Sequence, residues 1–300
     1  MKARRPALGA EARAGLVFLV PAMTLISVFF AMPVIAGFVL SLTDFDIYSL
    51  GSVANTRFVG TANYSGLVDN VVFWTSLRNT LYFSVVGGPL TIALALGAAL
   101  LLNAKLARFK PLFRTVYFAP VVTSIVAVAV VWRFLYHPRV GLLNRMLGLV
   151  GIEGVDWLGD PNWAMPAIIL LAIWKNFGYA AIIFLAGLQN APEELYEAAQ
   201  IDGAGPLRQF WNITLPELAP TFAFVTLITA IGYFQIFAEP YVMTPDGGPL
   251  NSTLTIVMLM YREGFRWWNM GFAAAIAFVL FALVFGTTML RGVFRKGAAR

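Results

Sequence analysis

The sequence predicts an all-α polytopic membrane protein with six transmembrane helices. Its 300 residues are 59% hydrophobic and only 12% charged, and the mean hydropathy is +0.76. The charged share is about half of that in a typical soluble protein, so the folded chain needs lipid around it. Six long apolar stretches and an uneven distribution of basic residues are the other two observations behind this prediction.

The six apolar stretches are each long enough to cross a bilayer, which takes about 20 mostly apolar residues. Five of them carry no charge, and the fourth carries only Lys175. The predicted spans are Ala14–Thr43, Asn79–Ala104, Thr115–Trp132 (extending to Tyr136), Pro161–Pro192, Leu218–Ala238 and Trp267–Leu290. Glycine and amide side chains interrupt the fourth and fifth spans, which predicts that these helices face protein or a cavity rather than lipid.

The basic residues predict that both chain ends lie in the cytoplasm. With that orientation, 13 of the 21 Lys and Arg residues fall in the inside segments and seven in the outside segments. Cytoplasmic loops of membrane proteins carry such an excess of basic residues. We therefore expect a cytoplasmic N-terminal segment (1–14), a six-helix membrane domain (15–291) and a cytoplasmic C-terminal tail (292–300). The net charge of +6 then reflects orientation and not binding of nucleic acid.

Several kinds of active site are excluded by composition. The chain has no Cys and a single His, His137, which excludes disulfides and Cys- or multi-His metal sites. It contains no Gly-x-x-x-x-Gly-Lys-Ser/Thr phosphate loop and no recognisable catalytic set. We expect no catalytic residue, metal or cofactor in this chain. An intramembrane enzyme and an ion-driven secondary transporter are the alternatives, but the predicted spans hold no acidic residue that either would use.

The segment between the fourth and fifth spans, residues 189–217, breaks the charge rule. It is cytoplasmic in the predicted orientation, yet it holds five acidic residues and one Arg. Pro192 followed by Glu193 and Glu194 is typical of a helix start. Gly203 is suited to the left-handed backbone that ends a helix. Two short helices with an exposed face are therefore expected here, as a docking element for another protein.

This loop also carries a resemblance. Glu197-Ala198-Ala199, Gly203, Ile213 and Leu215-Pro216 have the spacing of the signature loop of binding-protein-dependent ABC transporter permeases. In that family the loop is a coupling helix that docks on the cytoplasmic ATPase. The string Glu-Ala-Ala-Gln-Ile-Asp-Gly-Ala, which includes Asp202, resembles the carbohydrate branch of the family. The resemblance implies a role in ATPase coupling for Glu197, Ala198, Ala199, Asp202, Gly203, Ile213, Leu215 and Pro216.

Further matches extend the resemblance over nearly the whole chain. They are Phe58-Val59-Gly60 with Asn63-Tyr64, Arg78-Asn79-Thr80, Val242-Met243-Thr244, Gly247-Gly248-Pro249 and Ser252-Thr253. The stretch after the fifth span is typical of the first of the two permeases that such systems carry. One departure is Pro245-Asp246, which makes this stretch a residue longer than the common pattern.

The resemblance implies the architecture and partners of a type I ABC importer permease. The expected partners are a second permease subunit (a paralogue), two ATPase subunits that bind ATP and Mg, and an extracytoplasmic substrate-binding protein. The expected substrate is a sugar or oligosaccharide, or alternatively a related polar solute such as glycerol phosphate. The expected location is the cytoplasmic (inner) membrane of a bacterium or archaeon.

The substrate path is expected along the fourth and fifth spans, which line the sugar pocket in the permeases that this sequence resembles. Trp174, Gly178 and Ala181 share one face of the fourth span by spacing, and Gly232, Tyr233 and Ile236 are grouped on the fifth. Helix–helix packing is the alternative for these residues. Two interpretations of Lys175 stay open: it is a functional intramembrane cation, or its side chain pairs with a neighbouring helix.

Overall fold

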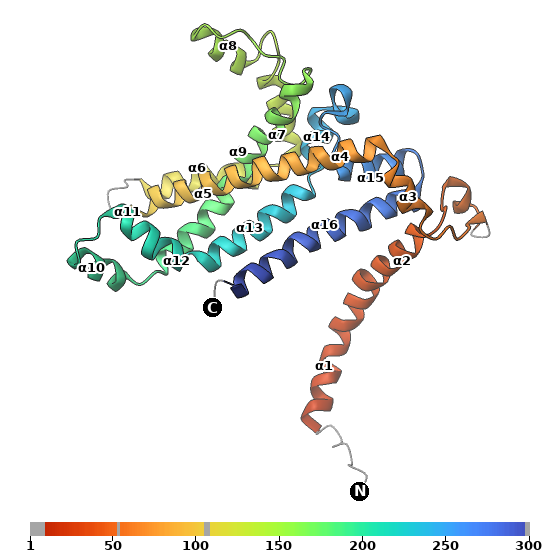
Figure 1. Ribbon diagram of the computed structural model, residues 1–300, viewed down its shortest axis with the longest axis horizontal. Coiled ribbons are helices and arrows are strands. Elements are labelled where there is room, and N and C mark those ends of the chain that lie inside the picture. Colours follow the sequence, from red (N-terminus) through yellow and green to blue (C-terminus); the bar gives the residue numbers. More distant parts are fainter. Residues whose placement is uncertain (1–9, 53–54, 105–108, 298–300) are drawn as a thin grey trace. The chain divides into compact units, whose positions relative to one another are not determined.

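The computed structural model describes residues 10–52, 55–104 and 109–297 (Figure 1). Within these ranges every named element is a helix, and the single β-bridge joins Thr43 to Phe58. The all-α prediction is confirmed. Most of the basic residues that define the predicted orientation lie outside the described side chains, among them those of segments 1–9 and 298–300, so the orientation stays a prediction.

Five helical stretches of the described chain are long and apolar enough to cross a membrane, and a bent helix pair supplies a sixth. The five are Ala14–Ser41, Val71–Asn103, Pro161–Gln189, Ala219–Met243 and Met270–Thr287. The bent pair is α6 (Lys110–Val122) and α7 (Ile125–Leu135), whose axes differ by 99°. The third span is therefore broken where the sequence predicted one continuous helix.

The chain divides into two compact units, residues 1–67 with 260–279 and residues 68–259 with 280–300. The first unit holds α1 (Ala10–Ile26), α2 (Met32–Ser41), α3 (Ala62–Val68) and the first part of α16 (Met270–Gly297). The second unit contains, besides α6 and α7, α4 (Val71–Tyr82), α5 (Gly88–Asn103), α8 (Leu142–Leu149), α9 (Pro161–Gln189), α10 (Glu193–Ile201), α11 (Pro206–Gln209), α12 (Leu215–Glu217), α13 (Ala219–Phe234), α14 (Ala238–Met243) and α15 (Ile256–Tyr261).

In the first unit, the Phe58-Val59-Gly60 and Asn63-Tyr64 motif fastens a loop to the end of α2. The backbone N–H groups of Val59 and Gly60 donate to the carbonyl of Leu42 at 2.9 and 3.1 Å. The Asn63 amide donates to the carbonyls of Ser41 and Thr43 at 2.9 and 2.8 Å. The motif thus supplies donors to carbonyls that the end of a helix leaves without partners.

The core of the second unit is the contact of α5 with α9. Alanines on both helices are almost completely buried, among them Ala95, Ala99, Ala180 and Ala181. Small side chains let two helix backbones approach closely, which is how helices associate when lipid removes the hydrophobic driving force. Phe184 and Leu188 of α9 complete this cluster with residues of α13 such as Val225. α9 is therefore the central helix of the unit, and it positions α6, α13 and α14 around itself (Figure 1).

The break in the third span has a chemical cause. Pro120 lies inside α6, and Thr123 and Ser124 adopt extended backbone angles between the two helices. The carbonyl of Pro120 accepts from the N–H and the hydroxyl of Thr123 at 3.4 and 2.6 Å. Lys175 of α9 donates from Nζ to the carbonyls of Pro120 and Thr123, both at 3.0 Å. An intramembrane backbone break must be satisfied by protein, and Lys175 satisfies this one.

A second set of sequence motifs fixes the segment after α14. The Asn79 amide of α4 donates to the carbonyls of Asn251 and Leu254 at 2.8 and 3.0 Å. The Thr80 hydroxyl accepts the backbone N–H of Ile256 at 2.9 Å. The two matched stretches, 78–80 and 242–253, are thus in contact although more than 160 positions separate them in the sequence. α4 begins at Val71, earlier than the predicted span, because the side chain of Asn70 caps it by accepting the N–H groups of Val72 and Phe73 at 2.8 and 3.1 Å.

Candidate functional site

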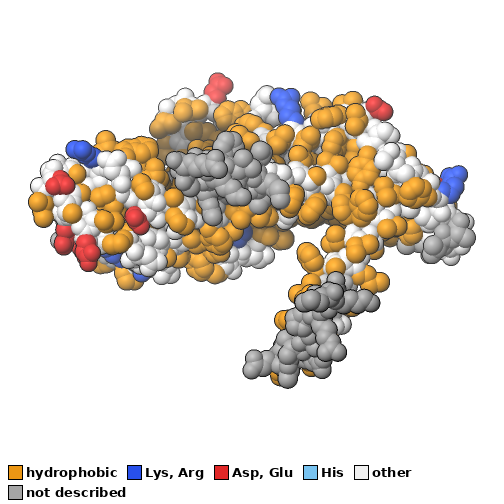
Figure 2. Space-filling model, turned by 60° about the horizontal axis from the view of Figure 1, so that its bottom comes forward, with side chains coloured by type: hydrophobic (Ala, Val, Ile, Leu, Met, Phe, Trp, Pro, Cys, Tyr) orange, Lys and Arg blue, Asp and Glu red, His pale blue; other side chains and the backbone are white. Residues whose placement is uncertain are grey.

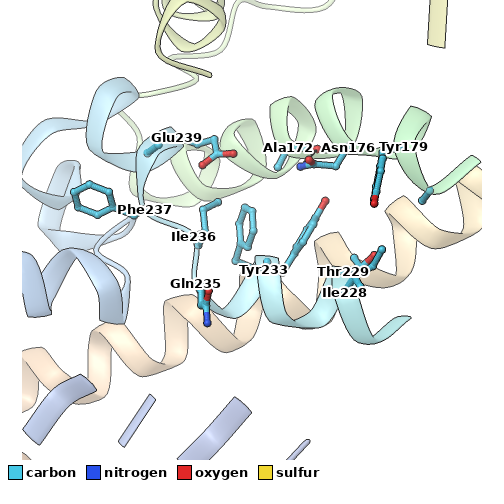
Figure 3. A pocket seen from close by; sticks show the side chains of 14 residues that line it. Ala172, Asn176, Tyr179, Ile228, Thr229, Tyr233, Gln235, Ile236, Phe237 and Glu239 are labelled. Carbon is cyan, nitrogen blue, oxygen red and sulfur yellow. Dashed lines mark hydrogen bonds between the residues drawn. The ribbon is translucent and has the colours of Figure 1, made fainter. Parts of the chain in front are cut away.

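A cavity of about 400 Å³ lies in the second unit between α9, α13 and α14 (Figure 3). This volume is in the range of small-ligand sites. Polar and aromatic side chains alternate around it. The lining residues are Phe83, Ala172, Asn176, Tyr179, Ala180, Ile228, Thr229, Gly232, Tyr233, Gln235, Ile236, Phe237, Ala238 and Glu239.

One wall of this cavity is a break in the fifth span. α13 ends at Phe234 and α14 begins at Ala238, so residues 235–237 are not helical. The freed carbonyl of Ile236 accepts a hydrogen bond from the Thr255 hydroxyl at 3.0 Å. Non-helical backbone at membrane depth is tolerated where protein satisfies it or where it lines a cavity. Discontinuous helices of this kind commonly border the binding sites of transporters.

The side chain of Tyr233, which forms part of the cavity wall, is held in place by several contacts. Its side chain is buried, its hydroxyl hydrogen-bonds the Thr91 hydroxyl of α5, and its ring lies 4.9 Å from the ring of Phe83. A Cβ on Gly87 would come within 2.7 Å of the Tyr233 ring, so the glycine makes room for it. The ring is fixed in place before any ligand arrives. A fixed aromatic face suits the apolar C–H face of a sugar.

The structure brings three of the six predicted path residues to the cavity. Gly232, Tyr233 and Ile236 of the fifth span line it, and Ile236 does so with an apolar side chain. Gly232 is exposed, with nothing within 4 Å of the position that a Cβ would take. Their contact with substrate stays a prediction.

The three residues predicted on the fourth span lie elsewhere. Gly178 packs against α6, where a Cβ would overlap the carbonyl oxygen of Tyr117. Ala181 belongs to the buried contact of α5 with α9, and the Trp174 ring packs 5.5 Å from Trp132. The face of α9 that lines the cavity instead carries Ala172, Asn176, Tyr179 and Ala180. A helix that is apolar almost all round gives no sequence signal of which face turns inward.

Glu239 is the cavity residue that sequence reasoning missed. The predicted fifth span ended at Ala238 and left this carboxylate outside, whereas the helical stretch runs on to Met243 and includes it. The expectation that the spans contain no acidic residue is therefore wrong. Tyr241, Val242 and Met243, which follow it, were the available signal that the apolar stretch continues.

The loop between the fourth and fifth spans folds into short helices at one end of the second unit (Figure 1). α10 ends in a Schellman motif, in which the N–H of Ala204 donates to the carbonyl of Ala199 and that of Gly203 donates to Gln200. Gly203 has a φ of +76°, the left-handed conformation that the sequence predicted. The four-residue spacing from Ala199 to Gly203 is the spacing that this motif requires.

Two side-chain contacts hold the loop together. The Tyr196 hydroxyl lies 3.1 Å from the Thr214 hydroxyl, and the Gln209 amide donates to the carbonyl of Ala204 at 2.8 Å. Of the predicted coupling residues, Ala199, Ile213 and Leu215 are partly buried. The other predicted coupling residues are exposed, namely Glu197, Ala198, Asp202, Gly203 and Pro216.

The outer face of this loop combines acidic and apolar side chains. Ile201 and Leu207 are 87% and 73% exposed, and Leu195 and Trp211 are also exposed. Figure 2 shows acidic side chains gathered at this end of the molecule beside hydrophobic ones. An apolar patch of this kind on a surface is typical of a contact with another protein.

Comparison with known proteins decides the family. Residues 14–298 match the family described as the inner membrane component of binding-protein-dependent transport systems. The chain belongs to this family. It is an integral membrane protein and a translocation subunit of an ABC importer. Members of the family are not enzymes, and ATP hydrolysis is carried by a separate subunit.

Individual members of the family show how far the similarity extends. The chain is 39% identical over 274 residues to the lactose transport system permease protein LacF of Rhizobium radiobacter, covering 90% of both chains. It is 39% identical over 249 residues to the arabinooligosaccharides transport system permease protein AraP of Halalkalibacterium halodurans, covering 81% of this chain and 78% of that protein. A solved bacterial ABC transporter that imports the acidic polysaccharide alginate matches with a TM-score of 0.74 at 26% identity, covering 94% of this chain and 96% of the other. The fold is therefore that of a type I ABC importer permease.

Proposed function

We propose that this permease imports a carbohydrate that an external binding protein delivers, and that it does so as one of two permease subunits on a pair of ATPases. The observation that carries the carbohydrate part is the lining of the cavity, which combines the aromatic rings of Phe83, Tyr233 and Phe237 with the amides of Asn176 and Gln235. Sugars present an apolar face and a polar edge, and this wall offers a partner for each. The names of several relatives refer to sugar transport and support the same conclusion.

A second permease subunit follows from the way the cavity opens. Gly232 and Gln235 are exposed, so the second unit by itself leaves the α13 side of the cavity open. A substrate crossing the membrane there would meet lipid unless another protein covered that side. A paralogous subunit in the cytoplasmic membrane would complete the path.

The ATPase contact is assigned to α10, α11 and the residues that follow them. If the loop lies in the cytoplasm, the exposed apolar side chains of Leu195, Ile201 and Leu207 are not covered by lipid. On this proposal they pack in a groove of the ATPase, and Glu197 lies at the edge of that contact. The chain itself binds neither ATP nor Mg.

Affinity purification tests this assembly. A tag on this chain, solubilised in mild detergent from cells that express the neighbouring genes, should recover an ATP-hydrolysing subunit and a second permease. Replacing the exposed Leu207 by Asp should reduce recovery of the ATPase while the second permease remains bound. Recovery of this chain alone from wild-type cells, with no ATP hydrolysis in the eluate, would contradict the proposal.

A further inference from the structure

The charge of the substrate is not decided by the relatives. Their names include neutral sugars such as lactose, whereas the solved alginate transporter imports an acidic polysaccharide. The cavity of this chain carries its own signal in Glu239, whose side chain extends from α14 toward the α9 side (Figure 3). Among the residues that line the cavity it is the sole Asp, Glu, Lys, Arg or His.

The cation that interacts electrostatically with this carboxylate makes its hydrogen bonds to other groups. Lys175 interacts electrostatically with Glu239, but its Nζ donates to the carbonyls of Pro120 and Thr123 at the break of the third span. Lys175 is not among the lining residues, and no direct ion pair joins it to Glu239. The one charged side chain that this chain places on the wall is therefore a carboxylate, and the charge of Lys175 acts on it from outside the lining.

We propose that Glu239 makes this cavity select uncharged saccharides and reject acidic ones. This inference rests on the proposed function, because it assigns a substrate class to the same cavity. A carboxylate accepts hydrogen bonds from two sugar hydroxyls, and such charge-assisted bonds are about twice as strong as neutral ones. A uronate or sulfonate in the same place would bring a second negative charge close to the first, in a site where water screens poorly.

The other lining groups support the same assignment. The amides of Asn176 and Gln235 and the hydroxyl of Thr229 can donate or accept, so they adapt to neutral hydroxyls. No Lys or Arg is present on the wall to form the bidentate or charge-paired contact that recognition of an anionic sugar usually employs. The part of the wall that this chain supplies therefore lacks the group that would compensate an acidic substrate for the repulsion of Glu239.

The test compares two probes that differ only at C6, where one carries a hydroxymethyl group and the other a carboxylate. The purified transporter complex in nanodiscs, without binding protein, is titrated with α-1,4-galactobiose and with digalacturonate, and binding is followed by ligand-observed NMR. We expect galactobiose to bind at least tenfold more tightly than digalacturonate. In Glu239→Gln, which keeps the shape of the side chain, this ratio should fall at least fivefold. Glu239→Lys should reverse the preference.

A matched control separates local from overall charge. Glu153→Gln makes the same chemical change at an exposed position outside the cavity and should leave the ratio unchanged. Digalacturonate that binds the wild-type complex as tightly as galactobiose, or a ratio that Glu239→Gln leaves unaltered, would overturn the inference. Preferred binding of an amino sugar such as chitosan disaccharide over galactobiose would also overturn it, because the carboxylate would then select a cation. In each of these results the carbohydrate importer itself would still stand, since sugar binds in all of them.

Discussion

Lys175 and Gly178 lie three residues apart on α9 and hold the same neighbour, α6, by different means. Lys175 supplies hydrogen bonds to the end of α6, and Gly178 supplies the space that the α6 backbone occupies. The sequence left the roles of both residues open between function and packing. The structure assigns both to the packing of α6 on α9, which sets the position of the broken third span.

Removing the Lys175 ammonium should destabilise this helix contact. In Lys175→Met the carbonyl of Thr123 loses the Lys175 donor inside the membrane region, while that of Pro120 keeps the Thr123 hydroxyl at 2.6 Å. Loss of the donor to Thr123 costs about 1–3 kcal/mol. Lys175→Arg, which can still donate to both carbonyls, should retain most of the stability. The free energy of unfolding of the purified chain in mixed micelles, measured by SDS titration, checks this. A Lys175→Met protein as stable as the wild type would show that water or another group satisfies these carbonyls.

Adding one methyl group at Gly178 should separate α6 from α9. Gly178→Ala places a Cβ on the Tyr117 carbonyl, and such overpacking costs about 1–3 kcal/mol. Gly97→Ala is the matched control, because Gly97 is a helical glycine of α5 with nothing within 4 Å of its Cβ position. The control should be neutral or stabilised by up to about 1 kcal/mol. The same unfolding assay compares the free energies of unfolding of the two variants. Equal stability would contradict the packing of α6 on α9 at Gly178.

At the scale of elements, hydropathy predicted where helices cross but not where they break. The third predicted span is charge-free on both sides of Thr123, so composition cannot distinguish a straight helix from a 99° bend. The fifth span likewise breaks at residues 235–237 because Thr255, distant in sequence, bonds the freed carbonyl of Ile236. Both breaks depend on partners that are brought near by the fold and are not visible in a local pattern.

The fold of the loop between the fourth and fifth spans was predicted more completely because its signals are local. The position of Gly203 relative to Ala199 specifies a helix end that needs no distant partner. The residues that line the cavity were predicted only in part. Residues next to the break in the fifth span were placed correctly, whereas the inward face of α9 was not, because α9 shows no amphipathic pattern to orient it.

Filling the cavity from α13 should stop transport without releasing the ATPase, whose proposed contact lies at α10 and α11. In Gly232→Phe the new ring enters open space beside Tyr233 and occupies volume that a sugar would need. Sugar uptake into proteoliposomes should fall at least tenfold, while copurification with the ATPase is unchanged. Gly97→Phe adds the same ring at an open position of α5 that does not line the cavity, and it should transport normally. Normal uptake by Gly232→Phe would move the substrate path away from this cavity.

At the scale of the whole molecule, the two functional regions lie at opposite ends of the fifth span. α10 to α12 precede α13 along the chain, and the cavity borders the break that follows it. α13 therefore links the loop proposed to contact the ATPase with the wall proposed to contact the substrate. A movement of the loop would reach the cavity through this one helix.

ATP hydrolysis by the reconstituted complex, with and without substrate-loaded binding protein, tests that claim most directly. Gly203→Val forces a branched side chain into a left-handed backbone (φ +76°), at a cost on the order of 1 kcal/mol or more. Gly205→Val adds the same side chain two residues later, at an exposed position with an ordinary φ of −71° and open space around it. We expect that Gly205→Val keeps most of the stimulation by loaded binding protein and that Gly203→Val loses it. Equal stimulation of the Gly203→Val and wild-type complexes would show that the conformation of this loop does not couple the ATPase to transport.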